Sequence, residues 1–364
     1  MTWRELSAEK FNSIKSKVIV DVRSPCEFVN ESIPGAINIP LLSDEERAEV
    51  GKTYKEKGEF RARRLALGLV APRIPEIVDR ISASKKENHT LVVHCWRGGM
   101  RSEAVVSFLS LMGIDCWRLT GGYKAWRRSV MDDFEADTYP FKVVVLDGLT
   151  GVGKTEVLKA LAAIGLDVLD LEAIANHRGS IFGGIGLGEQ PTQKNFDGYL
   201  WERLRTFSGD CVFLEAESRK IGSVRLPEFL MERIKYGTRV LLESNLSCRV
   251  KRISRDYHIL DHKEALVDLL GRVRIFKERL GHEKLRELSD ALIEDRGDDF
   301  IESMLRDYYD PLYSRHIRRR ADYALTVCSD DPFAAAAAIK EWCLDSARSG
   351  LFASIKRDEK TAPR

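Results

Sequence analysis

One cysteine of the chain stands in a setting that favours nucleophilic chemistry. Residues 94–102 read His-Cys-Trp-Arg-Gly-Gly-Met-Arg-Ser, after the apolar run 90–93 and before the apolar-periodic run 104–111. This order predicts a buried strand, a tight loop and a helix. The loop would hold Cys95 at a helix N-terminus, where unpaired backbone N–H groups and the helix dipole attract negative charge.

The neighbouring loop residues strengthen this anion-binding character. Gly98 and Gly99 permit the backbone angles that turn several amides inward, and Arg97 and Arg101 bring two permanent positive charges. Such a site stabilises a thiolate or another anion carried on sulfur, such as a persulfide, a perselenide or a phosphate-like oxyanion. The candidate loop around a catalytic Cys95 comprises Trp96, Arg97, Gly98, Gly99, Arg101 and Ser102.

Two other interpretations of this loop stay open at this point. A cysteine at a strand end is commonly an inert packing residue, although packing alone requires neither two glycines nor two arginines. A phosphatase loop also places a cysteine and an arginine, with five residues between them, before a helix. Cys95 and Arg101 have that spacing, so the loop alone does not separate a phosphatase from a chalcogen carrier.

A second motif lies near the middle of the chain. Residues 148–155 read Gly-Leu-Thr-Gly-Val-Gly-Lys-Thr, between a predicted strand at 141–146 and a predicted helix at 156–161. This is G-x-x-x-x-G-K-T in the strand–loop–helix setting that a phosphate-binding P-loop requires. The loop amides would hold a diphosphate, Lys154 would reach its oxygens, and the Thr155 hydroxyl would bind Mg²⁺. The predicted diphosphate-binding residues are Gly148, Gly151, Gly153, Lys154 and Thr155.

Acidic residues follow the next predicted strand. The run 210–215 is apolar and ends in Glu215, with Glu217 two residues later, as at the acidic strand end that assists Mg²⁺ in P-loop proteins. A third strand is predicted at 240–243. Because strands alternate with helical segments, this region is expected to form a parallel α/β sheet.

A glycine-rich loop is predicted between these strands. His177 and Arg178 precede the run 182–188, whose glycine content is incompatible with a core helix. We expect a ligand-wrapping loop beside the phosphate site, with His177 and Arg178 as ligand contacts. The alternative for His177 is a polar residue without a role in binding.

Arginines gather in three further places. Arg61, Arg63, Arg64 and Arg73 lie in a charged insertion at 41–80, which is predicted to be helical at 44–54 and 74–81. Arg249, Arg252 and Arg255 share one face of a predicted helix. Both sets could contact phosphates or simply cover a solvated surface.

The third set lies in the helical last part of the chain, where tyrosines at 308–313 meet arginines at 315–320. Aromatic rings interleaved with arginines suit single-stranded RNA, whereas arginines extending over core tyrosines are the alternative. The candidate RNA-binding residues are Tyr309, Tyr313, Arg315, Arg318 and Arg319.

Composition bounds the remaining possibilities. The 364 residues are 44% hydrophobic and 31% charged with a net charge of +2, so any nucleic-acid surface must be local. The seven cysteines show neither metal-like nor disulfide-like spacing. With neither a signal peptide nor a long apolar span, we expect a reducing, cytoplasmic, soluble protein without membrane contact.

Four blocks in the first third resemble a rhodanese domain. They are the runs 18–23, 25–40 and 120–126, together with the Cys95 loop, in the same order. This resemblance favours a chalcogen carrier over a phosphatase. It implies that Asp21 and Arg23 form a structural ion pair, and Cys26 is expected to be a packing residue.

The whole chain resembles the tRNA 2-selenouridine synthases. The resemblance rests on the Cys95 loop, the P-loop, His177–Ser180, Glu215–Arg219 with Ile221–Gly222, and Tyr308–Tyr313. It implies an α/β fold: a rhodanese-like domain (1–130), a linker (131–140), a P-loop NTPase-like parallel α/β domain with a helical C-terminal part (141–345), and a tail (346–364).

The family resemblance also implies a reaction. Selenium replaces the sulfur of the wobble 2-thiouridine in tRNAs for lysine, glutamate and glutamine, with selenophosphate as the selenium donor and an S-geranylated intermediate made from geranyl diphosphate. We expect Cys95 to carry selenium as a perselenide and residues 148–155 to hold the geranyl diphosphate, with Mg²⁺. Residues 182–187 are a candidate prenyl pocket, and an enzyme that supplies selenophosphate is a candidate partner.

Two rival functions remain compatible with the motifs. One is an ATP-dependent tRNA sulfurtransferase, in which a Cys95 persulfide attacks a substrate activated by ATP. The other is a regulator without catalytic activity that senses a nucleotide and binds RNA. ATP turnover without geranyl diphosphate would favour the first rival, and an unreactive Cys95 would favour the second.

Overall fold

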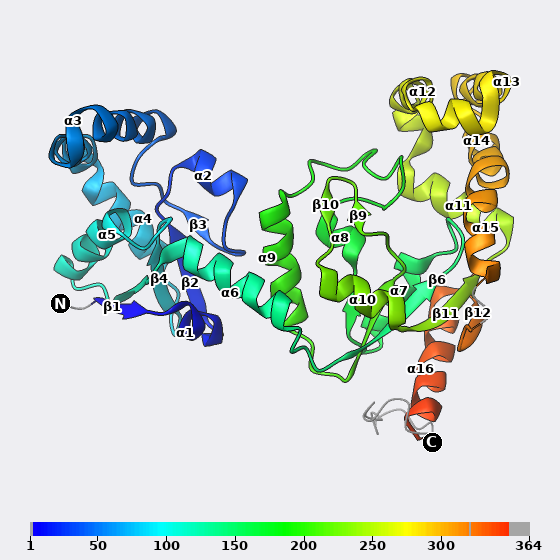
Figure 1. Cartoon of the computed structure of the whole chain (residues 1–364), viewed down its shortest axis with the longest axis horizontal. Coiled ribbons are helices and arrows are strands. Elements are labelled where there is room, and N and C mark those ends of the chain that lie inside the picture. Colours follow the sequence, from blue (N-terminus) through cyan, green and yellow to red (C-terminus); the bar gives the residue numbers. More distant parts are fainter. Residues whose placement is uncertain (1–2, 320–321, 349–364) are drawn as a thin grey trace. The chain divides into compact units, whose positions relative to one another are not determined.

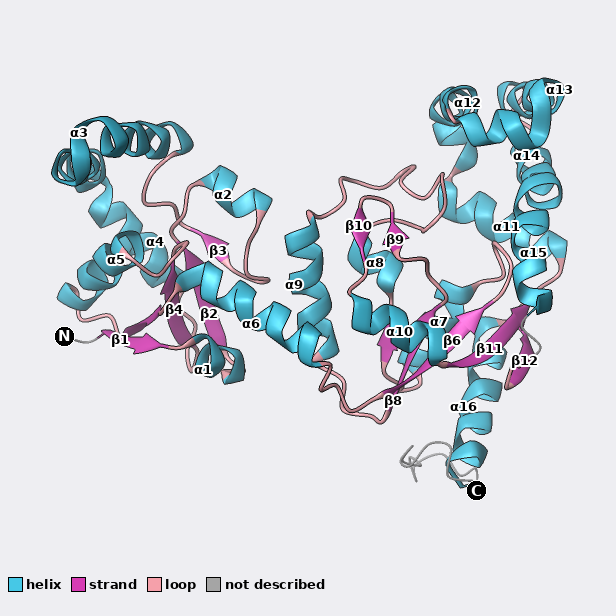
Figure 2. Ribbon diagram, in the orientation of Figure 1, coloured by secondary structure: helices cyan, strands magenta, loops and turns pink. Residues whose placement is uncertain are grey.

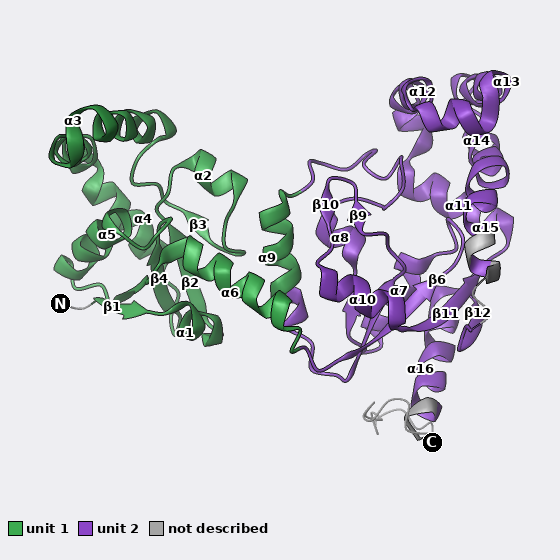
Figure 3. Ribbon diagram, viewed as in Figure 1, with its two compact units in different colours: residues 1–138, 191–202 green, residues 139–190, 203–364 purple. Residues whose placement is uncertain are grey.

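The computed structural model describes residues 3–319 and 322–348, and within these ranges it does not describe the side chains of residues 315, 316, 318, 319 and 346–348. The chain forms two compact units (Figure 3). Unit 1 comprises Met1–Thr138 and Pro191–Glu202, and unit 2 comprises Tyr139–Gln190 and Arg203–Arg364.

Unit 1 is built on a parallel five-stranded sheet flanked by helices (Figure 1). The strand order is β1-β5-β4-β2-β3, so the strand that leads into Cys95 is central. Its register pairs Asp21 with His94. The strands are β1 (Trp3–Leu6), β2 (Lys17–Asp21), β3 (Ile37–Asn38), β4 (Thr90–His94) and β5 (Cys116–Leu119).

Alternation along the strands creates the core of unit 1. Leu91, Val93 and Cys95 point to one side of the sheet, since successive side chains of a strand face opposite ways, and all three belong to one buried apolar cluster. Helices α4 and α5 close that cluster with residues such as Ile81 and Val106. The helices of unit 1 are α1 (Ala8–Ser13), α2 (Pro25–Asn30), α3 (Asp44–Val70), α4 (Ile74–Ser84), α5 (Met100–Leu111) and α6 (Gly122–Ala136), with the short 3-10 helix η1 (Ala71–Arg73). Helix α9 (Gln193–Leu204) also belongs to unit 1, except for its last two residues.

The charged insertion is more helical than expected. Helix α3 runs over Asp44–Val70, more than twice the length of the helix predicted at 44–54. It bends sharply at Gly58, which has φ 78° and so adopts a backbone conformation that glycine tolerates best. The bend divides α3 into two arms, residues 44–57 and 59–70.

The expected linker at 131–140 is largely wrong. Helix α6 continues to Ala136, and Val130 and Phe134 are buried along with Trp126. Their spacing of four residues places them on one helical face. Acidic residues between Val130 and Phe134 made this apolar helical pattern hard to recognise in the sequence.

Unit 2 has its own parallel sheet, in the order β12-β11-β6-β8-β7 (Figure 2). The strand before the P-loop is central, and the strand that ends in Glu215 lies directly beside it, in a register that pairs Leu146 with Glu215. The strands are β6 (Lys142–Asp147), β7 (Val168–Leu169), β8 (Cys211–Glu215), β11 (Thr238–Glu243) and β12 (Leu325–Cys328), with a separate antiparallel pair β9 (Lys220–Ile221) and β10 (Val224–Arg225).

Helices flank this sheet and also form a separate apolar cluster. Phe276, Phe300 and Tyr308 are buried in the cluster, whose residues come mostly from the segment between β11 and β12. The helices are α7 (Lys154–Ala163), α8 (Leu171–Ala175), α10 (Glu228–Tyr236), α11 (Leu246–Tyr257), η2 (Ile259–His262), α12 (Lys263–Arg272), α13 (Arg274–Ile293), α14 (Gly297–Met304), η3 (Leu305–Tyr309), α15 (Asp310–Arg319) and α16 (Pro332–Arg348).

The parallel α/β architecture with a helical C-terminal part confirms the expected fold class. Within the described part of the chain, no helix combines the length and the apolar character that crossing a membrane requires.

Candidate active site

Backbone amides at the start of helix α6 donate hydrogen bonds to the Cys95 loop. The amide of Tyr123 donates to the carbonyl of Cys95 at 2.9 Å, and that of Lys124 donates to the carbonyl of Trp96 at 3.0 Å. A Cβ atom on Gly122 would lie 2.1 Å from the Cys95 carbonyl oxygen, so only glycine fits there. The Gly-Gly pair at 121–122 therefore lets the first turn of α6 approach the loop closely enough to donate hydrogen bonds to two of its carbonyl groups.

The sulfur of Cys95 lies at the floor of this loop. Sγ is 3.3 Å from Oγ of Ser102, in the first turn of α5, and 3.9 Å from the carbonyl oxygen of Gly99. The residue is only 3% exposed, whereas Arg97 and Gly99 above it are exposed. The thiol is thus buried, and its polar contacts come from its own loop and the first turn of α5.

The two loop arginines differ in their surroundings. Arg97 is exposed. Arg101 instead makes a two-pronged ion pair with Glu27, with an Nη1–Oε2 distance of 2.6 Å. Although burial opposes the charge, the hydrogen bond with Glu27 and the charges of Glu27 and Cys95 raise the pKa of Arg101. Arg101 therefore supplies a fixed positive charge within electrostatic range of Cys95.

A buried ion pair between Asp21 and Arg23 packs near the Cys95 loop. Nη2 of Arg23 lies 2.6 Å from Oδ2 of Asp21, and both side chains are fully buried. This confirms their structural role. The guanidinium of Arg23 also lies over the ring of Tyr123, which stacks on Trp96. In contrast, Cys26 is exposed, so its expected packing role is wrong.

The P-loop of unit 2 follows the central strand β6 and opens helix α7. Gly153 caps the helix with φ 86°, and an added Cβ would lie 3.1 Å from the guanidinium of Arg252. Nζ of Lys154 is 3.3 Å from the carbonyl oxygen of Gly148 across the loop. The motif therefore has the backbone form that surrounds a diphosphate.

Three carboxylates meet beside this loop. Glu172, Glu215 and Glu217 each offer an oxygen, and these oxygens lie within 4.8 Å of one another. The hydroxyl of Thr155 lies 3.3 Å from a carboxylate oxygen of Glu172 and 3.5 Å from one of Glu215, so it can donate to either. The positions of Glu215 and Glu217 agree with their predicted place near the P-loop, and Glu172 joins them from helix α8.

Crowding of these carboxylates perturbs their ionisation. Burial and the nearby Glu217 charge raise the pKa of Glu172 to about 7. Burial, followed by the charges of Glu172 and Glu217, raises the pKa of Glu215 well above its usual range. Burial also raises the pKa of Glu217, although Lys154 opposes the rise. A group of carboxylate oxygens that repel one another, with Glu215 buried and Glu172 and Glu217 half-buried, fits a hard divalent cation such as Mg²⁺.

We expect Mg²⁺ to stabilise this protein in a pH-dependent way. Because the folded pKa of Glu172 lies above 4.5, the folded state binds protons more tightly, and stability without metal falls as pH rises from about 4.5 to about 7. Mg²⁺ needs the ionised carboxylates, so it should raise the unfolding temperature by about 5 °C at about pH 8 and by less at about pH 5.

Thermal unfolding with Mg²⁺ or with a chelator measures this effect. Glu215→Gln should lose the Mg²⁺ shift and, without metal, be at least as stable as the parent at about pH 8, because a buried carboxyl group that crowds Glu172 and Glu217 is gone. The matched control is Glu264→Gln, at an exposed acid on α12. A Mg²⁺ shift of equal size in Glu215→Gln would rule out this cluster as the cation site.

The predicted ligand loop is held mainly by its own contacts. The guanidinium of Arg178 donates to the carbonyls of Ile185 and Asp256, at 2.8 and 2.7 Å, and lies over the ring of Tyr257. Nδ1 of His177 accepts from the amide of Gly179 at 3.2 Å. Arg178 thus fixes the loop in this structure, and a ligand contact for His177 stays a prediction.

The candidate prenyl pocket at 182–187 stays a prediction, and the space beside its first residue is small. Phe182 is buried and stacks on Phe276 with ring centroids 5.3 Å apart. The cavity beside it has a volume of only about 40 Å³. Aromatic packing thus fills the space around the Phe182 side chain.

The arginines of α11 form ion pairs inside unit 2. Arg249 binds Asp310 at 2.5 Å and the carbonyl of Thr150 at 2.8 Å, and Arg252 binds Glu156 at 2.5 Å. Both arginines are buried. They brace the P-loop region and do not form a solvated face, whereas Arg255 is exposed and binds Glu156 and Asp256.

The predicted RNA-binding residues divide into three groups. Tyr309 is only 7% exposed within the apolar cluster, so packing, and not base stacking, is its role here. Tyr313 is 41% exposed and stacks on Tyr309. The side chains of Arg315, Arg318 and Arg319 lie outside the described residues.

Comparison with known proteins identifies the family. The model of the tRNA 2-selenouridine synthase AAA domain matches residues 141–345, and that of the rhodanese-like domain matches residues 4–129. A tRNA 2-selenouridine synthase of Marinobacter nauticus is 35% identical over 85% of this chain and 88% of its own length. The chain belongs to the tRNA 2-selenouridine synthase family. Synthases of Pseudomonas syringae pv. syringae and Cupriavidus pinatubonensis are 35% and 37% identical, over 84% and 83% of this chain and 91% and 89% of their own lengths.

Membership of the selenouridine synthases makes this chain an enzyme. Sequence reasoning missed two residues that shape its sites, Glu27 and Glu172. Glu27 had a local signal, because Ser24 and Glu27 form the S-x-x-E pattern of a capping box. Glu172 follows a strand of only two residues, β7, so no clear acidic strand end marked it.

Proposed function

We propose that the enzyme converts wobble 2-thiouridine of tRNAs for lysine, glutamate and glutamine into 2-selenouridine through an S-geranylated intermediate. The observation that carries this proposal is the pairing of two sites in one member of the family. One is a cysteine loop with a fixed arginine, and the other is a P-loop with a carboxylate cluster. The first suits selenium transfer, and the second suits an alkyl diphosphate.

The need for two sites follows from the chemistry of the base. A ring carbon that carries a thione is a weak electrophile, and sulfide is a poor leaving group. Alkylation of the sulfur makes the carbon more electrophilic and turns the sulfur into a leaving thiolate. Because both co-substrates, geranyl diphosphate and selenophosphate, arrive activated, the route needs no ATP hydrolysis.

The P-loop serves the first step. The thiouridine sulfur attacks C1 of geranyl diphosphate, the carbon–oxygen bond breaks with its electron pair, and diphosphate leaves, while the base loses its N3 proton to solvent. Lys154 and the loop amides stabilise the negative charge that grows on the diphosphate. Thr155 and the carboxylates of Glu172, Glu215 and Glu217 would hold Mg²⁺, which supplies further charge neutralisation when bound.

Cys95 serves the second step. Its thiolate attacks the selenium of selenophosphate, a sulfur–selenium bond forms, and the electron pair of the selenium–phosphorus bond leaves with phosphorus as phosphite. The terminal selenium then attacks C2 of the base, and geranyl thiolate leaves. A dithiol reductant finally cleaves the sulfur–selenium bond and frees both selenouridine and Cys95.

This electron count gives a direct test of the perselenide. We expect one phosphite for each selenouridine formed and a requirement for a dithiol, because the phosphorus gains the two electrons that the dithiol later provides. Phosphorus NMR of the reaction mixture distinguishes phosphite from orthophosphate. Orthophosphate as the only phosphorus product, without a dithiol requirement, would show that selenium reaches the base as selenide and not through Cys95.

The alternative is an ATP-dependent tRNA sulfurtransferase, favoured only by the general nucleotide-binding form of the P-loop. It requires ATP turnover in the presence of tRNA and in the absence of geranyl diphosphate. A selenophosphate-supplying enzyme stays a candidate partner, and an RNA surface around Tyr313 and α15 stays part of the proposal.

A further inference from the structure

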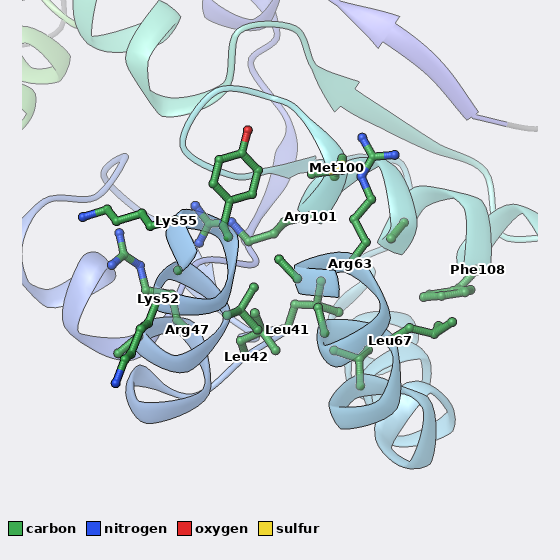
Figure 4. A pocket seen from close by; sticks show the side chains of 18 residues that line it. Leu41, Leu42, Arg47, Lys52, Lys55, Arg63, Leu67, Met100, Arg101 and Phe108 are labelled. Atoms are coloured by element: carbon green, nitrogen blue, oxygen red, sulfur yellow. The ribbon is translucent and has the colours of Figure 1, made fainter. Parts of the chain in front are cut away.

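A cavity in unit 1 lies beside the Cys95 loop. It has a volume of about 920 Å³ and opens between the two arms of α3 and the first turns of α5 (Figure 4). This volume falls within the range of small-molecule sites, roughly 300–1,000 Å³. The apolar part of its wall includes Leu41, Leu42, Val50, Ala62, Leu67 and Phe108.

Large apolar side chains of this wall are left open to solvent. Tyr54, Leu67 and Met100 are 54%, 61% and 52% exposed, and all three line the cavity. Exposed apolar side chains that gather around one cavity are typical of a binding site. The cavity is therefore shaped for an apolar ligand.

The rim of the cavity is basic. Arg47, Lys52, Lys55, Arg63 and Arg101 line it, and none of the described lining residues is acidic (Figure 4). Four of these five side chains form ion pairs with glutamates outside the lining: Arg47 and Arg101 with Glu27, Lys52 with Glu56, and Arg63 with Glu59. Five cations against three glutamates leave an excess of positive charge at the rim. The matching ligand is an apolar chain attached to a polyanion.

The cavity and the candidate catalytic loop share Arg101. Its neighbour Met100 also lines the cavity, and Ser102, which follows them, lies 3.3 Å from Sγ of Cys95. Ala104 and Phe108, one and two turns further along α5, lie on the same helical face as Met100 and extend this wall of the cavity. A chain lying in the cavity therefore has one end beside the loop that holds the nucleophile.

We propose that this cavity takes the geranyl chain of the S-geranylated wobble uridine, with the basic rim contacting phosphates of the anticodon loop. The inference rests on the proposed function and deepens it. The ten-carbon chain needs space that the cavity of about 40 Å³ beside Phe182 does not offer. When selenium on Cys95 attacks C2 of the base, the carbon–sulfur bond breaks and geranyl thiolate remains in the cavity as the leaving group.

Filling the cavity tests the proposal. Ala66 lines it from the second arm of α3 and is half-buried, so Ala66→Trp should occupy the space of the chain. The probes are anticodon stem-loop RNAs that carry either S-geranyl- or S-dimethylallyl-2-thiouridine. We expect the parent to bind the geranyl probe at least ~10-fold more tightly than the dimethylallyl probe, since shortening an apolar chain by an isoprene unit loses that much.

In Ala66→Trp this preference should disappear, with affinity for the geranyl probe reduced at least ~10-fold. Geranylation of thiolated RNA from geranyl diphosphate should be unchanged. The matched control is Ala83→Trp, at an exposed position of α4 outside the cavity. Leu67→Asp provides a second variant that spares the core, because Leu67 is exposed.

Other outcomes overturn the proposal in distinguishable ways. Unchanged chain preference in folded Ala66→Trp and Leu67→Asp means that the chain lies elsewhere. Loss of geranylation with intact binding of the geranyl probe assigns the cavity to the free donor. A dimer that both variants disrupt, with RNA binding intact, assigns it to a second copy of the chain. If the parent itself forms no selenouridine from the geranyl probe, the proposed function fails, whatever the cavity binds.

Discussion

Cys95→Ala should lose selenium insertion while S-geranylated tRNA accumulates. The variant keeps the P-loop and its carboxylate cluster, which lie in unit 2, so the alkylation step has all its groups. It lacks the only atom proposed to carry selenium. Loss of a nucleophile typically reduces turnover by at least ~10³-fold, so selenouridine should fall below detection. Mass analysis of digested tRNA measures both nucleosides.

Folding of the variant must be checked, because Cys95 belongs to the buried cluster of unit 1. Removing its sulfur should cost about 1 kcal/mol, which thermal unfolding detects. Cys328→Ala is the matched control, because that cysteine is exposed in unit 2 and the proposed chemistry does not use it. Equal loss of geranylation and selenation in folded Cys95→Ala would contradict the division of labour between the two sites.

Lys154→Ala should show the opposite pattern. Removing one positive charge from beside a departing diphosphate typically costs 10²–10³-fold in rate, so geranylation should fall by about that factor. Selenation of RNA that is supplied already geranylated should continue at the rate of the parent. The two half-reactions, assayed separately with geranyl diphosphate or with the S-geranylated probe, measure the contrast.

Lys159→Ala is the matched control for this variant. Lys159 lies on the same helix α7, is exposed and stands outside the loop. Geranylation that stays at the parent's rate in Lys154→Ala would remove the P-loop from the alkylation step. A fall in both half-reactions would show that Lys154 has a wider structural role than charge stabilisation.

Local patterns made much of this fold predictable. The Cys95 loop and the P-loop were recognisable because a strand, a glycine-rich turn and a helix follow one another within about twenty residues. The ion pair of Asp21 and Arg23 was likewise a local feature, two residues apart. Each of these inferences needed only neighbours in the sequence.

Contacts between distant segments were not predictable in the same way. Helix α9 lies in sequence within the region expected to form the P-loop domain, yet residues 191–202 pack into unit 1. The amide of Ser32 donates to Asn195 at 2.8 Å, and the indole of Trp201 donates to Asp133 at 2.7 Å. More than sixty residues separate the partners in each pair, and no local period reveals such contacts.

The same limit explains the errors at the sites. Glu172 joins Glu215 and Glu217 only when β7 and β8 pair side by side. Tyr309 carried the composition of an RNA-stacking residue, but the cluster that covers it comes from several helices. The cavity beside Cys95 depends on the bend of α3 at Gly58. A single glycine in a charged segment does not predict such a bend.

The central claim is that alkylation at one site prepares the base for selenium from the other. The most direct measurement incubates the purified enzyme with thiolated tRNA and each co-substrate in turn, without ATP, and weighs the RNA products. We expect geranyl diphosphate alone to give S-geranylated tRNA, selenophosphate alone to leave the tRNA unchanged, and the two together to give selenouridine. Selenouridine formed from selenophosphate in the complete absence of geranyl diphosphate would contradict the account.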